Sequence, residues 1–251
     1  MVRGLDLFRD YFKSYTDAYI LIGGTACDLA MERMGLYFRA TKDLDIVLIL
    51  EALDVEFVNT FWSFIKEGQY KNRQKSTGKK LFYRFYDPEK KAFPYMIELF
   101  SRKPDVFELS LESHLAPIPM DEEVSSLSAI LMDNDYYDFI KNGQKVTDDL
   151  SIISHEYLIP LKSRAWLDLC QLKSSGETID SKDIRKHKND VFRLYQILSL
   201  DTDIALPQTI ADDMRVFLEN VSDEPPDLKN LGIHNTSLED VIGNLKKIYN
   251  L

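Results

Sequence analysis

Hydrophobic and polar positions before residue 154 alternate between helical and strand spacing. Apolar residues at helical spacing predict amphipathic helices over residues 6–15 and 54–67, and short apolar runs predict buried strands over 18–22 and 44–50. A further helix is expected over 26–34, which completes the strand–helix–strand–helix order of an α/β beginning. More strands are expected over 70–74, 80–86, 93–101, 107–112 and 124–132, and a hairpin turn over 141–144.

From residue 154 onward the pattern is helical throughout. Ser154 is a favourable N-cap residue, and the apolar residues after it recur at spacings of three and four, which predicts a helix to about residue 172. The predicted fold class is therefore α+β, with an N-terminal mixed-sheet domain over residues 1–153 and an all-helical domain over 154–251. Three more helices are expected in the second domain, over residues 183–198, 206–220 and 238–249.

Two carboxylates stand at the start of the second strand. Because strand side chains alternate between faces, Asp43 and Asp45 should point the same way, while Leu44 and Ile46 point into the core. Two carboxylates this close repel each other unless a cation lies between them or one takes up a proton. Mg²⁺ prefers oxygen ligands and suits such a pair.

A glycine turn, Gly23-Gly24-Thr25, lies between the first strand and the first long helix. Glycine lets the backbone approach a ligand closely and adopt a positive φ. The N-terminus of the following helix offers N–H groups and a positive dipole end, which favour a phosphate. A phosphate cradle beside a carboxylate pair is the minimum apparatus for metal-assisted transfer from a nucleoside triphosphate.

These motifs resemble a known family. The hydrophobic strand, Gly-Gly turn, helix and Asp-x-Asp strand are similar to the nucleotidyltransferase fold of the DNA polymerase β superfamily. Within this superfamily the sequence most resembles the AbiEii-type toxin branch of minimal nucleotidyltransferases. The motif that carries this resemblance is Gly23-Gly24-Thr25-Ala26, followed by Arg39-x-Thr41-x-Asp43-Leu44-Asp45. Position 25 is Thr where many relatives carry Ser, which keeps the hydroxyl.

The resemblance implies roles for residues outside the two motifs. Glu98 is a lone acid in an apolar strand, where a carboxylate is costly unless it is paired or metal-bound. The family pattern implies that Glu98 completes a metal site with Asp43 and Asp45 for two Mg²⁺ ions, with Mn²⁺ as an alternative, and that Asp190 assists catalysis. The implied nucleotide-binding residues are Gly23, Gly24, Thr25, Arg39 and Lys162.

Two of these residues also have plainer interpretations, and the sequence departs from the family motif at one position. Lys162 could be a surface lysine whose stem covers apolar surface, and Glu98 could face solvent at a sheet edge. Asn189 separates Lys188 from Asp190, whereas the family more commonly has an adjacent Lys-Asp pair.

The implied activity is transfer of a nucleoside monophosphate from a triphosphate to an acceptor hydroxyl, with release of pyrophosphate, in a cleft between the two domains. The acceptor stays open among a transfer RNA end, a protein and an aminoglycoside-like small molecule, and the toxin resemblance implies an antitoxin protein as a partner. The alternative is a non-catalytic nucleotide- or partner-binding module that keeps the fold.

Composition and charge limit the classes of protein to which this chain could belong. The net charge of −10 and pI of about 5.0 argue against a broad surface for duplex nucleic acid, although residues 71–84 and 182–193 are basic enough for a local groove. No apolar run approaches the ~20 residues of a membrane span, and the N-terminus lacks a signal-peptide core, so a cytoplasmic location without membrane attachment is expected. The cysteines and histidines show no metal-ligand spacing, which excludes a zinc site.

Overall fold

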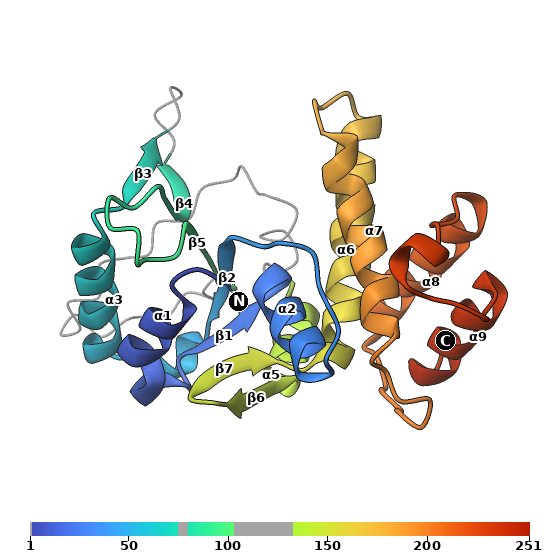
Figure 1. Cartoon of the computed structure of the whole chain (residues 1–251), viewed down its shortest axis with the longest axis horizontal. Helices are drawn as coiled ribbons and strands as arrows, with labels where there is room; N and C mark the ends of the chain where they lie inside the picture. Colours follow the sequence, from blue (N-terminus) through green and yellow to red (C-terminus); the bar gives the residue numbers. More distant parts are fainter. Residues whose placement is uncertain (1, 75–79, 103–132) are drawn as a thin grey trace. The chain divides into compact units, whose positions relative to one another are not determined.

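The computed structural model describes residues 2–74, 80–102 and 133–251 (Figure 1). The chain divides into two compact units, one formed by residues 1–29 with 39–153 and the other by residues 30–38 with 154–251. The first unit holds all the described strands and the second is helical, so the α+β fold class is confirmed. The strands expected over 107–112 and 124–132 lie outside the described residues.

The described strands of the first unit form one seven-stranded mixed sheet in the order β3-β4-β5-β2-β1-β7-β6. β1 is antiparallel to β2 and parallel to β7, and β2 is parallel to β5. The five predicted strands that lie within the described residues are confirmed, with bounds shifted by a few residues. The strands are β1 (Tyr19–Ile22), β2 (Asp43–Leu48), β3 (Lys71–Gln74), β4 (Lys80–Tyr86), β5 (Met96–Phe100), β6 (Gln144–Thr147) and β7 (Leu150–Ile153).

Two amphipathic helices, α1 (Leu5–Phe12) and α3 (Val55–Gly68), pack on one face of the sheet (Figure 1). Their contact is aromatic: the ring of Phe64 lies 5.9 Å from Phe8 and 5.5 Å from Phe12, both in edge-on geometry. Aromatic pairs in this geometry add about 0.5–1.5 kcal/mol each beyond the burial of their surface. Alternate residues of β2 and β5, among them Leu44, Ile46 and Ile97, belong to this cluster, which fixes the direction of the remaining side chains of both strands.

The prediction of a hairpin turn over 141–144 was wrong, because the helix α5 (Asn134–Asn142) ends within this stretch and β6 begins at Gln144. Asp133 caps the helix by accepting a hydrogen bond from the Asp135 N–H at 2.8 Å. Aromatic and β-branched residues favour strands mainly through packing on a pleated surface, so burial on one helical face outweighs that preference here. The buried residues are Tyr136, Tyr137, Phe139 and Ile140.

The hairpin itself joins β6 to β7 a few residues later. Its turn is Asp148-Asp149, with φ of +52° and +59°. Positive φ at both central residues is what a two-residue turn between twisted antiparallel strands requires, and Asp tolerates it better than most residues.

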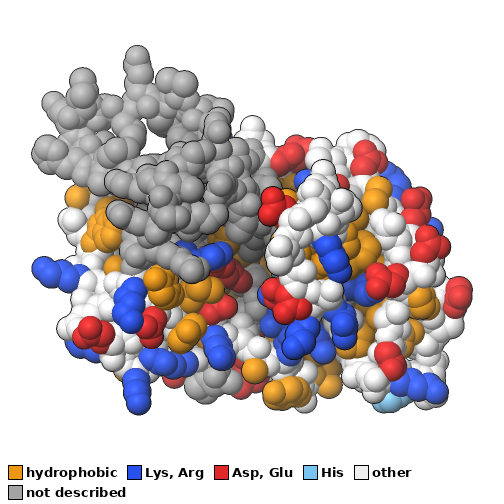
Figure 2. Space-filling view, turned by 90° about the horizontal axis from the view of Figure 1, so that it is seen from above, with side chains coloured by type: hydrophobic (Ala, Val, Ile, Leu, Met, Phe, Trp, Pro, Cys, Tyr) orange, Lys and Arg blue, Asp and Glu red, His pale blue; other side chains and the backbone are white. Residues whose placement is uncertain are grey.

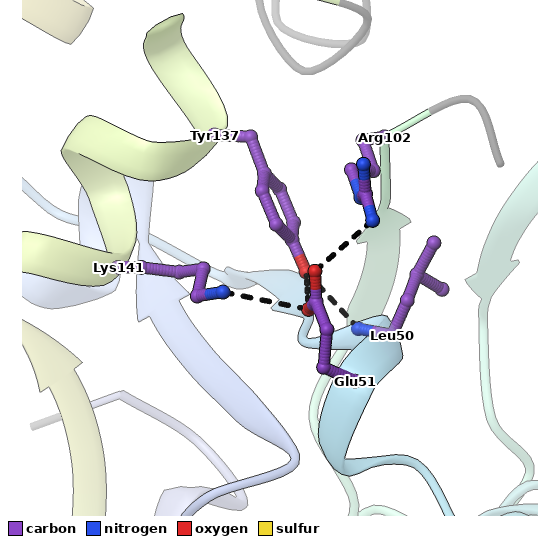
Figure 3. A network of polar contacts seen from close by, with 5 residues as sticks. All are labelled: Leu50, Glu51, Arg102, Tyr137 and Lys141. Atoms are coloured by element: carbon purple, nitrogen blue, oxygen red, sulfur yellow. Dashed lines mark hydrogen bonds and ion pairs between the residues drawn. The ribbon is translucent and has the colours of Figure 1, made fainter. Parts of the chain in front are cut away.

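A polar network holds the C-terminal ends of β2 and β5 to α5 (Figure 3). The Tyr137 hydroxyl donates to Glu51 at 2.7 Å and accepts from the Leu50 N–H at 3.0 Å. Arg102 donates to the other Glu51 oxygen at 3.1 Å, and the Lys141 ammonium lies 3.6 Å from this carboxylate. Burial raises the pKa of the Tyr137 hydroxyl and the bond to Glu51 raises it further, so this group stays a donor at neutral pH.

The second unit is built from four long helices, and all four predicted after residue 154 are confirmed. Trp166 and Phe217 pack edge-on with ring centroids 5.5 Å apart and join two of these helices. Among the helices that the structure describes, none combines the length and the apolar character needed to cross a bilayer. The four are α6 (His155–Ser174), α7 (Ser181–Tyr195), α8 (Gln208–Asp223) and α9 (Leu238–Ile248).

Candidate functional site

The three predicted metal-binding carboxylates lie on one face of the sheet. Leu44 and Ile46 of β2 belong to the core beneath α1 and α3, so Asp43 and Asp45 lie on the opposite face, as predicted from strand alternation. Asp45 and Glu98 are direct neighbours in the parallel pairing of β2 with β5. Adjacent strands lie about 4.8 Å apart, so the backbone brings these two acids side by side.

The Gly-Gly turn lies directly against this carboxylate face. Gly23 follows Ile22, which is the pairing partner of Asp45, and Gly23 has a φ of +66°. A Cβ atom added at Gly23 would lie 1.7 Å from Oδ2 of Asp45. One added at Gly24 would lie 2.5 Å from Oγ1 of Thr41. The positive φ and the close approach to Asp45 favour glycine at position 23, whereas a Cβ at position 24 would require the Thr41 side chain to move.

Two further predicted phosphate ligands flank the turn. Thr25 is fully buried, and its hydroxyl donates to the Asp43 carbonyl at 2.7 Å. This hydrogen bond ties α2 (Gly23–Arg33) to β2. An Arg39 guanidinium nitrogen comes within 3.9 Å of a Cβ placed at Gly24, so Arg39 does lie beside the turn.

Glu98 has a partner that the sequence did not reveal. Arg84 lies opposite Glu98 in the antiparallel pairing of β4 with β5, and its guanidinium forms an ion pair with the Glu98 carboxylate. The Glu98 side chain is 18% exposed, so Glu98 is neither a solvent-facing residue at a sheet edge nor a fully buried acid. Strand alternation places Arg84 on the carboxylate face only once the register of β4 against β5 is known.

The oxygen donors on this face fit a hard divalent cation in type, but they are not gathered around one point. Within the described residues, no three side chains of His, Cys, Asp or Glu lie close enough together to hold a metal ion. The Glu98 carboxylate on this face is paired with the Arg84 guanidinium.

Lys162 and Asp190 lie in the second unit and are paired with each other. The Lys162 ammonium on α6 is 3.3 Å from the Asp190 carboxylate on α7, and Arg193 lies 3.3 Å from the other carboxylate oxygen. Lys162 is 4% exposed and Asp190 is fully buried, so the interpretation of Lys162 as a surface lysine was wrong. This buried ion pair links α6 to α7.

A second buried charge cluster joins α6 to α8. Arg164 contacts Asp168 through Nε at 2.9 Å and Asp213 through NH1 at 2.9 Å. Oδ2 of Asp168 has no hydrogen-bond partner among the described residues. The spacing of Arg164 and Asp168, four residues apart on one helix, was the available signal for this contact.

The pH dependence of stability follows from this cluster. Burial raises the pKa of Asp168 from 3.8 to about 6, the Arg164 guanidinium opposes the rise, and Asp213 adds to it. The folded state therefore holds a proton that the unfolded state has lost, and stability falls as the pH rises from about 4 to about 6. We expect Asp168→Asn to raise the free energy of unfolding at pH 7.5 by roughly 1–2 kcal/mol, after allowance for solvent screening.

Urea unfolding at pH 5.0 and 7.5 checks this expectation. Between pH 5.0 and 7.5 the free energy of unfolding should fall more for the wild-type chain than for Asp168→Asn. Asp201→Asn, a substitution on the exposed surface, should show the same fall as the wild type. An equal pH dependence in all three proteins would contradict a proton held at Asp168.

Several cations of the two basic segments are paired with acids where the structure describes their side chains. In the first segment Lys71 pairs with Asp87 and Arg84 with Glu98. In the second, over 182–193, three cations pair with acids: Lys186 with Asp183, Lys188 with Glu224 and Arg193 with Asp190. On the described part of the face in Figure 2, basic and acidic side chains are interspersed, which does not match the single-sign surface that duplex nucleic acid favours.

No family model matches the chain, and a search of curated proteins finds no match. The likeness to nucleotidyltransferases therefore depends on the residues of this chain and their placement, above all Gly23, Gly24, Asp43 and Asp45.

Proposed function

We propose that this protein is a cytoplasmic, metal-dependent nucleotidyltransferase with its carboxylate site in the first unit. One observation carries the proposal: the positive-φ glycine that ends β1 lies against Asp45, on the same sheet face as Asp43 and Glu98. Few functions other than binding a phosphorylated ligand with a cation call for both a tight glycine turn and adjacent carboxylates.

Each group of this face has a role in the proposed reaction. Asp43 and Asp45, joined by Glu98 once Arg84 releases it, would hold Mg²⁺ or Mn²⁺. Bound divalent cations would supply Lewis-acid activation of the acceptor hydroxyl and neutralise charge on the phosphates. The backbone of Gly23 and Gly24 would bind the phosphates from the first turn of α2.

The bond changes balance without a further reactant. The acceptor oxygen forms a bond to the α-phosphorus of the triphosphate, and the bond from that phosphorus to the bridging oxygen breaks. Pyrophosphate leaves with the electron pair of the broken bond, and the proton of the acceptor hydroxyl passes to water. The proposed acceptors are a transfer RNA end, a protein or an aminoglycoside-like molecule, and a toxin role would add an antitoxin partner. The net charge of −10 favours the protein and small-molecule acceptors.

A second candidate function is supported by the Glu98–Arg84 ion pair. With the third carboxylate held by a cation of the chain itself, the fold could bind a nucleotide and perform no transfer. The two candidates differ in one observable: transfer of labelled nucleotide to any acceptor.

Calorimetric titration of ATP, GTP, CTP and UTP with Mg²⁺ tests the site. We expect one triphosphate to bind the wild type, and Asp43→Asn/Asp45→Asn to weaken metal-dependent binding at least tenfold, since each lost carboxylate–metal contact removes a charged ligand. Asp10→Asn, an exposed acid of the same unit, is the matched control. Equal binding by the double variant would exclude these carboxylates as the metal site. Binding without transfer from α-labelled triphosphate would favour the non-catalytic module.

A further inference from the structure

The second unit contains a cavity of about 700 Å³ that the proposed function does not use. Its wall is formed by α6, by α7 and by the segment from Glu224 to Leu231, which includes the short 3₁₀ helix η3 (Lys229–Leu231). This volume lies within the usual range of small-ligand pockets. All lining residues belong to the second unit, so the cavity is separate from Gly23, Asp43 and Asp45.

A buried lysine forms part of the cavity wall. Lys188 is 5% exposed, and its ammonium lies 5.9 Å from the ring centre of Trp166, which also lines the cavity. The ammonium donates to the Glu224 carbonyl at 2.8 Å and lies 3.2 Å from the Glu224 carboxylate. A lysine this buried is stabilised only while an anion or several acceptors contact it.

The carboxylate that contacts Lys188 comes from an exposed side chain. The Glu224 side chain is 77% exposed and belongs to the Glu224-Pro225-Pro226 loop at the cavity wall. Such a carboxylate loses little by returning to water, whereas the Lys188 ammonium gains from any anion that replaces it. The Glu224 carboxylate thus occupies a position that the anionic group of a ligand would take.

Other cations converge on the same cavity. Lys173 of α6 and Arg185 of α7 line it together with Lys188, which makes three cations against the two carboxylates of Glu224 and Asp227. Once Glu224 moves away, three cations face a single acid. An Arg with two Lys residues suits a doubly charged group such as phosphate better than a single carboxylate.

We propose that this cavity binds a small phosphate-bearing molecule, whose phosphate replaces the Glu224 carboxylate at Lys188 and contacts Arg185. The proposal does not depend on the nucleotidyltransferase function, because it uses neither a divalent metal nor any residue of the first unit.

Cys170 provides a direct readout. Cys170 lines the cavity and is partly exposed, whereas Cys27 is fully buried, so an alkylating reagent reports on Cys170 in the folded protein. The rate of iodoacetamide labelling is measured by peptide mass spectrometry with increasing inorganic pyrophosphate or ADP. The samples contain EDTA, and sodium chloride keeps the ionic strength constant. The same titration in Asp43→Asn/Asp45→Asn separates this site from the proposed catalytic one.

Three single variants give the expected pattern. Glu224→Gln should tighten binding about threefold or more, because it removes the competing charge but keeps the carbonyl acceptor of Lys188. Arg185→Ala should weaken binding about fivefold, as loss of a partly solvated ion pair does. Lys182→Ala, an exposed lysine of the same helix that does not line the cavity, should leave binding unchanged.

Protection of Cys170 by either compound with this pattern supports the site. Tighter binding of ADP than of pyrophosphate identifies a nucleotide as the ligand, and equal binding identifies the phosphate alone. Absence of protection at millimolar concentrations overturns the proposal. Weaker binding by Glu224→Gln, or equal losses in Arg185→Ala and Lys182→Ala, would overturn it as well.

Discussion

Replacing Asp190 by alanine is expected to lower the free energy of unfolding by about 3–5 kcal/mol, enough to unfold a marginally stable chain. Asp190 is fully buried, and the substitution leaves the Lys162 ammonium, 4% exposed, without the carboxylate that lies 3.3 Å away. A buried cation that has lost its counter-ion retains its desolvation cost without the Coulombic compensation. Urea denaturation followed by circular dichroism measures the loss.

Two variants separate a structural from a catalytic role of this pair. Lys162→Met/Asp190→Leu removes both charges and should recover most of the stability, because apolar residues of similar volume replace a buried ion pair at little cost. Arg193→Ala removes the more exposed partner, which is 23% exposed, and should cost much less, about 1 kcal/mol. If Asp190→Ala unfolds at the wild-type urea concentration but has lost nucleotide transfer, Asp190 is a catalytic acid and its structural role is refuted.

The first unit shows how far strand patterns determine a site. Alternation alone placed Asp43 and Asp45 on one face with Leu44 and Ile46 on the other, because the period of a strand is fixed by its backbone. The need for glycine at position 23 was also predictable, since a sharp turn after a buried strand calls for a residue without a Cβ. Each of these features depends on residues that are close together in the sequence, so it can be predicted from a single sequence.

The parts that sequence reasoning missed depend on pairing between distant segments. Arg84 and Glu98 are 14 positions apart, and only the register of β4 against β5 makes them neighbours. Lys162 and Asp190 are buried because α6 and α7 pack together, whereas the pattern of α6 alone allowed a surface lysine. Tyr137 and Ile140 have strand-like side chains and lie on a helix because that face is buried. Tertiary packing decided each of these cases.

The Gly23→Ala substitution gives the most specific test of the candidate site. A Cβ there would lie 1.7 Å from Oδ2 of Asp45, and the backbone φ of +66° disfavours any residue with a Cβ. We expect a loss of about 1–2 kcal/mol for the backbone conformation and roughly 1–3 kcal/mol more for the clash. Because Asp45 must move to relieve the clash, metal-dependent triphosphate binding should be lost together with this stability.

Gly35 offers a matched control within the same chain. Its φ is +70°, and a Cβ there meets nothing within 4 Å, so Gly35→Ala isolates the backbone cost from the clash. The difference in unfolding free energy between the two variants therefore measures the close approach of Gly23 to Asp45. Nucleotide titration of both variants then connects that approach to ligand binding. A Gly23→Ala protein that is no less stable than Gly35→Ala and binds triphosphate normally would show that the turn and the carboxylates do not form one site.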